Sequence, residues 1–187
     1  MTKRVYNFGA GPAMLPLPVL QRMQEEWLDW QGLGVGVIEI SHRSPQFEAL
    51  VDETSALLCE LMAIPEDYQV LYCHGGGQLA FAMVPLNLLG LQPAKLGLYV
   101  ETGSFARRAA VECGRYGSTR TIASSAATAY DHIPELDPAT VDPTASYLHI
   151  TTNNTAMGTR WQRFPTGLPV PLVGDFTSEL LSREVNV

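Results

Sequence analysis

Apolar residues at helical spacing mark two stretches in the first third of the chain. Between residues 17 and 30 they recur every three or four positions, which predicts an amphipathic helix (Val19, Met23, Trp27 and Trp30). Ser44 followed by Pro45 is typical of an N-cap with proline at the first helical position, so a second helix is predicted from there. Pro65 closes this second helix.

Short continuous apolar runs predict buried strands along the rest of the chain. The runs cover residues 69–73, 95–100, 119–123, 147–151 and 169–174. One helix is predicted after the first run, with Pro85 kinking or crowding it, and another over residues 105–116, capped by Ser104. Residues 124–145 are predicted to form a loop with little regular structure. Strands that alternate with helices indicate an α/β fold with a mostly parallel sheet and helices on both faces.

A glycine loop, His74–Gln78, leads from the first of these runs into its helix. Three consecutive glycines let the backbone turn sharply and approach a ligand closely. The first amides of a helix have no internal partner and carry the positive end of its dipole, so the loop can bind an anion, most often phosphate. The loop matches neither G-x-G-x-x-G nor the Walker pattern, and an ordinary tight turn is the alternative. His74 itself is interpreted as a structural histidine at a strand end.

Polar or glycine clusters follow four of the predicted strands. They are residues 74–78, 101–105, 152–155 and 175–178. In a parallel sheet, ligands bind beyond the carboxyl ends of the strands, where these clusters would meet. Asp175 closes the last strand either as a helix N-cap or as the partner of a buried cation. A phosphate loop and an acid in one crevice are what pyridoxal phosphate needs, because its ring nitrogen requires a group that keeps it protonated.

Composition narrows the classes of function. The chain is 46% hydrophobic and 9% aromatic, as globular proteins are, and its 187 residues suffice for one good core. Its net charge of −7 argues against a nucleic-acid partner, and the absence of an apolar run of about 18 residues argues against a membrane span. Cys59, Cys73 and Cys113 have no zinc-ligand spacing, so we expect free thiols in a reducing compartment and no metal. The N-terminus lacks the apolar core of a signal peptide, which favours the cytoplasm.

Several motifs together resemble those of the phosphoserine aminotransferases, a class-V family of fold-type-I, pyridoxal-phosphate-dependent transaminases. The resemblance runs from residue 5 nearly to the end of the chain, and the Gly-Ala-Gly-Pro-Ala and Ser-His-Arg-Ser pieces distinguish this family from other transaminases. In chain order the motifs are residues 7–13 (NFGAGPA), 41–44 (SHRS), 84–88 (VPLNL), 102–104 (TGS), 153–155 (NNT) and 174–178 (GDFTS). The resemblance implies the large, cofactor-binding domain of such an enzyme over residues 17–187, preceded by an N-terminal arm over residues 1–16.

The resemblance also implies roles for individual residues at the cofactor. The amides of Gly76, Gly77 and Gln78 are expected to hold the phosphate. Phe105 occupies the place of an aromatic residue, usually tryptophan, that stacks on the pyridine ring; otherwise it is a core residue of its helix. The resemblance implies further that Thr155 bonds the cofactor near its phenolic oxygen and that Asp175 pairs with the ring nitrogen.

The resemblance assigns His42 and Arg43 to the distal acid group of the substrate, because arginine binds a carboxylate or phosphate with two parallel hydrogen bonds. It implies amino transfer between glutamate and 3-phosphohydroxypyruvate, with 2-oxoglutarate and phosphoserine as products, in serine and pyridoxine biosynthesis by a homodimer. Another fold-type-I transaminase, such as an alanine–glyoxylate enzyme, is one alternative, against which His42 and Arg43 argue. A non-catalytic remnant that binds a phosphorylated ligand, or nothing, is the other.

The chain departs from the family pattern at several positions, of which the missing lysine matters most. Glycine replaces serine at Gly9, phenylalanine replaces tryptophan at Phe105, and Asn154 stands where glutamate is common. Lysine occurs only at Lys3 and Lys95, in the wrong motifs, and the family's Schiff-base lysine is expected beyond Val187, as is the small C-terminal domain. We therefore expect no transaminase activity from the 187-residue chain by itself. Reading the gene beyond Val187 would separate a truncated enzyme from a remnant.

Overall fold

The computed structural model describes residues 4–185, and the chain falls into two compact units. One unit comprises the residues up to Leu71 together with those from Arg183 on, and the other comprises Tyr72–Ser182. This division differs from the boundary after residue 16 expected from the sequence, which stays a prediction.

The first unit contains two α-helices. α1 (Leu17–Glu25) ends earlier than predicted, and residues 26–30 are not helical. A 3₁₀ turn, η1 (Val37–Glu39), precedes α2 (Pro45–Leu61). The Ser44 hydroxyl accepts a hydrogen bond from the amide of Phe47 (3.3 Å), so the predicted cap and the proline at the first turn of α2 are confirmed.

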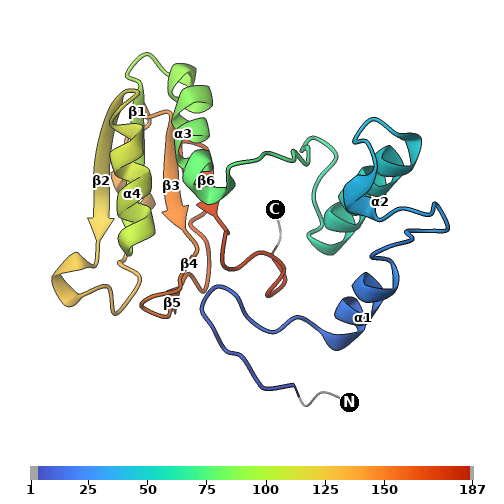
Figure 1. Cartoon of the computed structure of the whole chain (residues 1–187). Coiled ribbons are helices and arrows are strands. Elements are labelled where there is room, and N and C mark those ends of the chain that lie inside the picture. The colour runs from blue at the N-terminus through green and yellow to red at the C-terminus, as the bar shows by residue number, and fades with distance from the viewer. Residues whose placement is uncertain (1–3, 186–187) are drawn as a thin grey trace. The chain divides into compact units, whose positions relative to one another are not determined.

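The second unit is built on a parallel sheet in the order β2-β1-β3-β6 (Figure 1). Its strands are β1 (Leu96–Glu101), β2 (Ser118–Ser124), β3 (Tyr147–Thr151) and β6 (Leu172–Asp175). Beyond the carboxyl end of β3 the chain forms a small hairpin of β4 (Asn153–Asn154) and β5 (Thr159–Arg160). The predicted parallel sheet is therefore present, with strands close to the predicted ranges.

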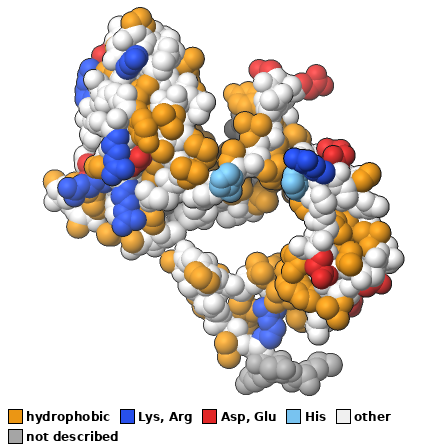
Figure 2. Space-filling view, turned by 45° about the horizontal axis from the view of Figure 1, so that its top comes forward, with side chains coloured by type: hydrophobic (Ala, Val, Ile, Leu, Met, Phe, Trp, Pro, Cys, Tyr) orange, Lys and Arg blue, Asp and Glu red, His pale blue; other side chains and the backbone are white. Residues whose placement is uncertain are grey.

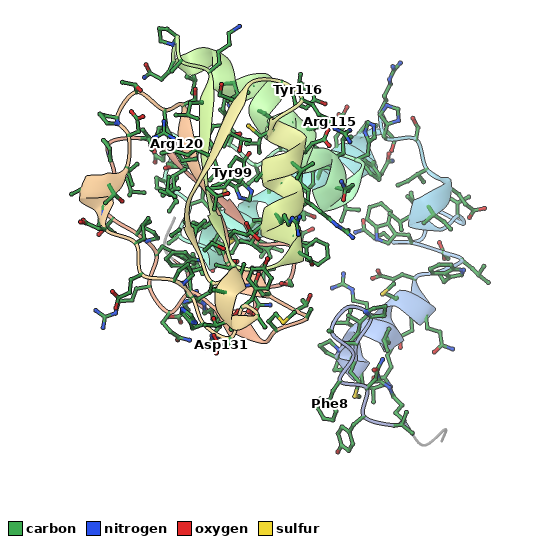
Figure 3. All side chains as sticks on the ribbon, turned by 90° about the vertical axis from the view of Figure 1, so that its left-hand side faces the viewer. Phe8, Tyr99, Arg115, Tyr116, Arg120 and Asp131 are labelled. Carbon is green, nitrogen blue, oxygen red and sulfur yellow. The ribbon has the colours of Figure 1, made fainter. Side chains whose placement is uncertain are left out.

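Two helices cover one face of this sheet. α3 (Gly76–Leu88) and α4 (Ser104–Cys113) lie against it and contact each other (Figure 1). Tyr99 and Tyr147 of the sheet pack there with Phe81 of α3 and Cys113 of α4. The Tyr99 and Tyr147 hydroxyls are 2.7 Å apart, and Figure 3 shows Tyr99 in the interior of the unit.

The opposite face of the sheet is covered by loop segments. Leu98, Val100, Leu148 and Ile150 point to this side. They pack against side chains from residues 133–145 and 161–170, where the chain has only short 3₁₀ turns such as η4 (Pro138–Thr140). In the described part of this unit, helices thus lie on one face of the sheet, whereas the sequence predicted helices on both.

Three local predictions are wrong. Residues 69–73 form no strand, and Leu71 and Tyr72 are 75% and 55% exposed. No described strand pairs with this run, and an apolar run forms a strand only when a neighbouring strand provides partners for its backbone hydrogen bonds. His74 is consequently exposed and not at a strand end. Ser104 is the first residue of α4 rather than its cap, since Gly103 holds the N-cap position.

Pro85 is tolerated within α3, which continues to Leu88. Its ring is buried, and apolar burial at this position offsets the loss of one backbone donor. The three cysteines are free thiols, as predicted. Within residues 4–185 no helix combines the length and apolar character that a membrane crossing requires.

Candidate functional site

The carboxyl ends of β1, β3 and β6 lie at one edge of the sheet because these strands are parallel. The start of α3 joins them there. The Oδ1 atom of Asp175, at the end of β6, accepts hydrogen bonds from the Thr177 amide (3.0 Å) and the Thr177 hydroxyl (2.6 Å). A Cβ atom added to Gly77 would lie 2.9 Å from the same Thr177 hydroxyl oxygen. Thr177 therefore connects the predicted phosphate loop to the predicted ring-nitrogen acid.

The start of α3 has the features of an anion-binding helix terminus. Gly75, its N-cap, has a left-handed φ of 94°, and no side chain caps the helix. The amides of Gly76, Gly77 and Gln78 stand in the first turn, where backbone donors have no partner within the helix. Gly76 also has a positive φ, 60°, which a side chain would disfavour. The loop can thus offer several N–H groups to one ligand.

Further hydrogen bonds link the segments that follow β6, β3 and β1. The Asn153 amide donates to the Ser178 hydroxyl (2.8 Å), which donates to the Asn153 carbonyl (3.2 Å). Asn154 is buried, and its side-chain oxygen accepts a hydrogen bond from Thr102 (3.2 Å), just before α4. These hydrogen bonds join three of the four polar clusters predicted to meet at the strand ends, and the fourth, residues 74–78, comes close to Thr177 at Gly77.

Phe105 lies at the start of α4 and Thr155 lies just after β4, next to the residues that make these hydrogen bonds. Phe105 is the second residue of α4 and is 43% exposed, with the guanidinium carbon of Arg108 5.5 Å from its ring centroid. Phe105 is therefore not a core residue of its helix, and its exposed ring can contact a ligand. Thr155 is half-buried and begins the turn between β4 and β5.

Two buried polar side chains of β3, the strand next to Asp175, were not singled out from the sequence. His149 and Thr151 are each 3% exposed, and the Nδ1 atom of His149 and the Oγ1 atom of Thr151 have no hydrogen-bond partner within residues 4–185. Thr151 lies directly opposite Asp175 in the sheet register. Burial lowers the pKa of His149 from 6.5 to about 4, against an opposing effect of the Asp175 charge. The signal in the sequence was the pair of polar residues in an otherwise apolar buried strand.

An open groove of about 510 Å³ runs along α4 beside this region. Gln78, Ser104 and Tyr130 line it together with Arg107, Arg108 and Arg115. Figure 2 shows Lys and Arg side chains gathered on this unit. Figure 3 shows Arg115 beside Tyr116, and both bond Glu112 on the preceding turn (Arg115 at 3.2 Å, Tyr116 at 3.3 Å). The groove shares Gln78 with the predicted cofactor site but does not include Asp175.

The predicted substrate residues belong to the other unit. His42 and Arg43 are exposed in the turn before α2, where the Arg43 amide donates to the Ser41 hydroxyl (3.2 Å). Lys3 lies outside the described residues. Lys95 is exposed at the amino end of β1, the edge of the sheet opposite to Asp175. Residues 4–185 contain no cluster of three or more side chains suited to hold a metal ion.

Comparison with known proteins agrees with this arrangement. The model of one protein family, "Aminotransferase class-V", matches residues 5–168. The chain belongs to this family. Among curated relatives, the phosphoserine aminotransferase of Bacillus subtilis is 46% identical over 185 residues, which cover 99% of this chain and 50% of the relative. That of Streptococcus thermophilus is 45% identical over 188 residues.

Solved structures of class-V aminotransferases have the same fold. A phosphoserine aminotransferase from Bacillus circulans subsp. alkalophilus superposes with a TM-score of 0.90 at 41% identity, over 98% of this chain and 50% of the other. A pyridoxal-phosphate-bound one from Trichomonas vaginalis gives 0.86 at 31% identity, over 97% and 50%. The family resemblance and the fold predicted from the motifs are confirmed. The chain spans about half the length of the relatives it matches.

Proposed function

We propose that this chain forms the cofactor-binding part of a phosphoserine aminotransferase. The enzyme would use pyridoxal phosphate to exchange an amino group between glutamate and 3-phosphohydroxypyruvate, yielding 2-oxoglutarate and phosphoserine. One observation carries the proposal: the Thr177 hydroxyl bonds the carboxylate of Asp175 and lies close to Gly77 of the anion-binding loop, where an added Cβ atom would come within 2.9 Å of it. The identity of 46% along 99% of the chain to a phosphoserine aminotransferase supports it.

The residues present fit pyridoxal phosphate, which when bound supplies an electron sink for amino transfer. In this proposal the amides of Gly76, Gly77 and Gln78 hold the phosphate. The carboxylate of Asp175 bonds the protonated ring nitrogen, while Thr177 holds one oxygen of this carboxylate through its amide and its hydroxyl. The exposed ring of Phe105 stacks on the cofactor, and the Thr155 hydroxyl bonds its phenolic oxygen.

Recognition of the substrate is assigned to His42 and Arg43. The guanidinium group of Arg43 would bind the distal phosphate of 3-phosphohydroxypyruvate or the distal carboxylate of glutamate through two parallel hydrogen bonds. We propose that the protein acts as a homodimer in the cytoplasm and in serine and pyridoxine biosynthesis, in line with the family resemblance. A transaminase that prefers alanine and glyoxylate is the competing assignment.

The 187-residue chain by itself is expected to bind the cofactor weakly and without a covalent bond. A covalent link requires a lysine amine, and Lys95 precedes β1 at the far edge of the sheet. Six residues of strand separate it from the carboxyl edge, a distance of about 20 Å.

The first test measures pyridoxal phosphate binding to the 187-residue chain by absorbance and dialysis, followed by borohydride reduction and peptide mapping. We expect weak binding and no reduced adduct. Gly77→Ala should weaken binding, because its methyl group would press on Thr177, whereas Gly90→Ala, which has open space around it, should not. Transamination together with an adduct on Lys3 or Lys95 would overturn this assignment.

The second test assays the complete product of the gene with glutamate as amino donor. We expect amino transfer to 3-phosphohydroxypyruvate, and a much lower rate with glyoxylate or pyruvate. A preference for glyoxylate with alanine would replace the proposal by the competing transaminase. Absence of transfer to any oxo acid, with phosphate-ligand binding retained, would favour a non-catalytic protein.

A further inference from the structure

The face of the sheet beneath α3 carries polar side chains where apolar ones are the rule. His149 of β3 lies opposite Tyr99 of β1 and Val173 of β6, and Thr151 lies opposite Asp175. Side chains two residues apart on a strand point to the same face, so all five share the face that α3 covers. Thr151 therefore lies beside Asp175 on this face, and His149 lies beside Val173, one residue pair further from the carboxyl end.

His149 is held by aromatic rings rather than by hydrogen bonds. Its imidazole stacks on Tyr99, with ring centroids 5.1 Å apart at 30°, and meets the edge of Phe81 of α3 at 6.3 Å. Its Nδ1 atom has no hydrogen-bond partner within residues 4–185, and neither has the hydroxyl of Thr151. Such orphaned atoms are rare in folded proteins, and each calls for an explanation. A core that needed only volume here would be filled by Leu or Phe.

The surroundings of His149 determine the protonation state of its imidazole. The ionisable side chains on this face are Asp175 from β6, Tyr99 from β1 and Tyr147 from β3 itself, and α3 has none in the range Gly76–Leu88. Burial favours the neutral ring and outweighs the charge of Asp175, which raises the pKa of His149 and favours the protonated ring. A neutral imidazole retains one N–H donor, which can stabilise a nearby carboxylate without adding a charge.

We propose that His149 is a positioning residue for Asp175, supported by the hydroxyl of Thr151. Thr177 holds one oxygen of the Asp175 carboxylate from the loop side. The Nδ1 atom of His149 and the hydroxyl of Thr151, which have no hydrogen-bond partner within residues 4–185, would bond the same carboxylate from β3 when the cofactor is bound, so that it stays ionised and directed to the ring nitrogen. This inference rests on the role proposed for Asp175 above.

The test combines nuclear magnetic resonance of the histidine rings with cofactor binding, using the full chain. The ¹⁵N shifts of the His149 ring, assigned from their loss in His149→Phe, are recorded at pH 7 in the wild type and in Asp175→Asn. Asn retains the acceptor for Thr177 but removes the charge. We expect the His149 shifts to change in Asp175→Asn and on addition of pyridoxal phosphate. Asp142→Asn, a matched change at a carboxylate that bonds Thr144 and Arg120, should leave them unchanged.

Measurements of pyridoxal phosphate affinity distinguish a positioning role of His149 from a role in packing alone. His149→Phe keeps the ring volume between Tyr99 and Phe81, and we expect it to weaken pyridoxal phosphate binding about tenfold with unchanged stability at pH 7. His149→Gln, which retains an N–H donor, should recover part of that affinity. Loss of stability with unchanged affinity in both variants would overturn the proposal.

The two proposals fail in different ways. His149 shifts that are identical in the wild type and in Asp175→Asn, with cofactor binding intact in the wild type, would overturn the positioning role and leave the proposed function standing. A wild-type chain that binds no pyridoxal phosphate would overturn the proposed function and this inference with it.

Discussion

Replacing His149 by Phe should change how the stability of the second unit depends on pH. The buried imidazole has a pKa of about 4 in the fold, well below its ordinary value of 6.5, because burial disfavours the charged ring. The fold therefore favours the neutral form. Its contribution to stability is fully present above pH 6.5 and is lost as the pH falls from 6.5 to about 4, where the unfolded chain takes up a proton and the folded chain does not.

The size of the effect follows from the two pKa values. Between them, the free energy of unfolding falls by about 1.4 kcal/mol for each pH unit. Between pH 7 and pH 5 the wild type should thus lose about 2 kcal/mol through His149 alone, and about 3 kcal/mol by pH 4. His149→Phe lacks this term, and at pH 7 it removes a buried nitrogen that has no partner within the described chain.

The assay is urea unfolding at pH 7, 6 and 5, followed by the fluorescence of Trp161. This tryptophan is 6% exposed in the second unit, and a background with Phe at positions 27 and 30 isolates its signal. We expect the stability difference between wild type and variant to move by about 2 kcal/mol in favour of the variant from pH 7 to pH 5. His74→Gln, a change at an exposed histidine, serves as control. A difference that is the same at all three pH values would refute the reasoning.

Three further outcomes are expected. Arg43→Ala in the complete gene product should lower kcat/KM for phosphorylated substrate about 10- to 150-fold and leave cofactor affinity unchanged, and equal kinetics with phosphoserine would contradict the assignment. Phe105→Ala should weaken pyridoxal phosphate binding about 2- to 12-fold, measured by fluorescence titration, whereas Phe105→Trp should not. Gly97→Ala should destabilise the second unit by about 1–3 kcal/mol in urea unfolding, because its Cβ would lie 2.8 Å from the Tyr147 hydroxyl; an unchanged midpoint would show that the core yields there.

Local chemistry made parts of the fold predictable from the sequence. Ser44 and Pro45 determine the start of α2 within a single turn, so the cap could be placed without any knowledge of the rest of the protein. The apolar run of residues 147–151 coincides with β3, since a fully buried strand needs apolar residues at successive positions. The resemblance of the motifs pointed to the family, and the polar clusters at the strand ends pointed to the edge of the sheet where the site lies.

Interactions between distant segments decided the rest. The run before the glycine loop is as apolar as β3 but forms no strand, because strand formation depends on hydrogen bonds to a neighbour that sequence pattern does not reveal. The close approach of Gly77 to the Thr177 hydroxyl brings together residues a hundred positions apart. His149 was one polar residue in an apolar run until the parallel register of β3 and β6 set it opposite Val173, two residues before Asp175 on the same face of the sheet. Composition and periodicity indicated most of the elements that form, whereas sheet register, which depends on the packing of the whole unit, determined which side chains share the site.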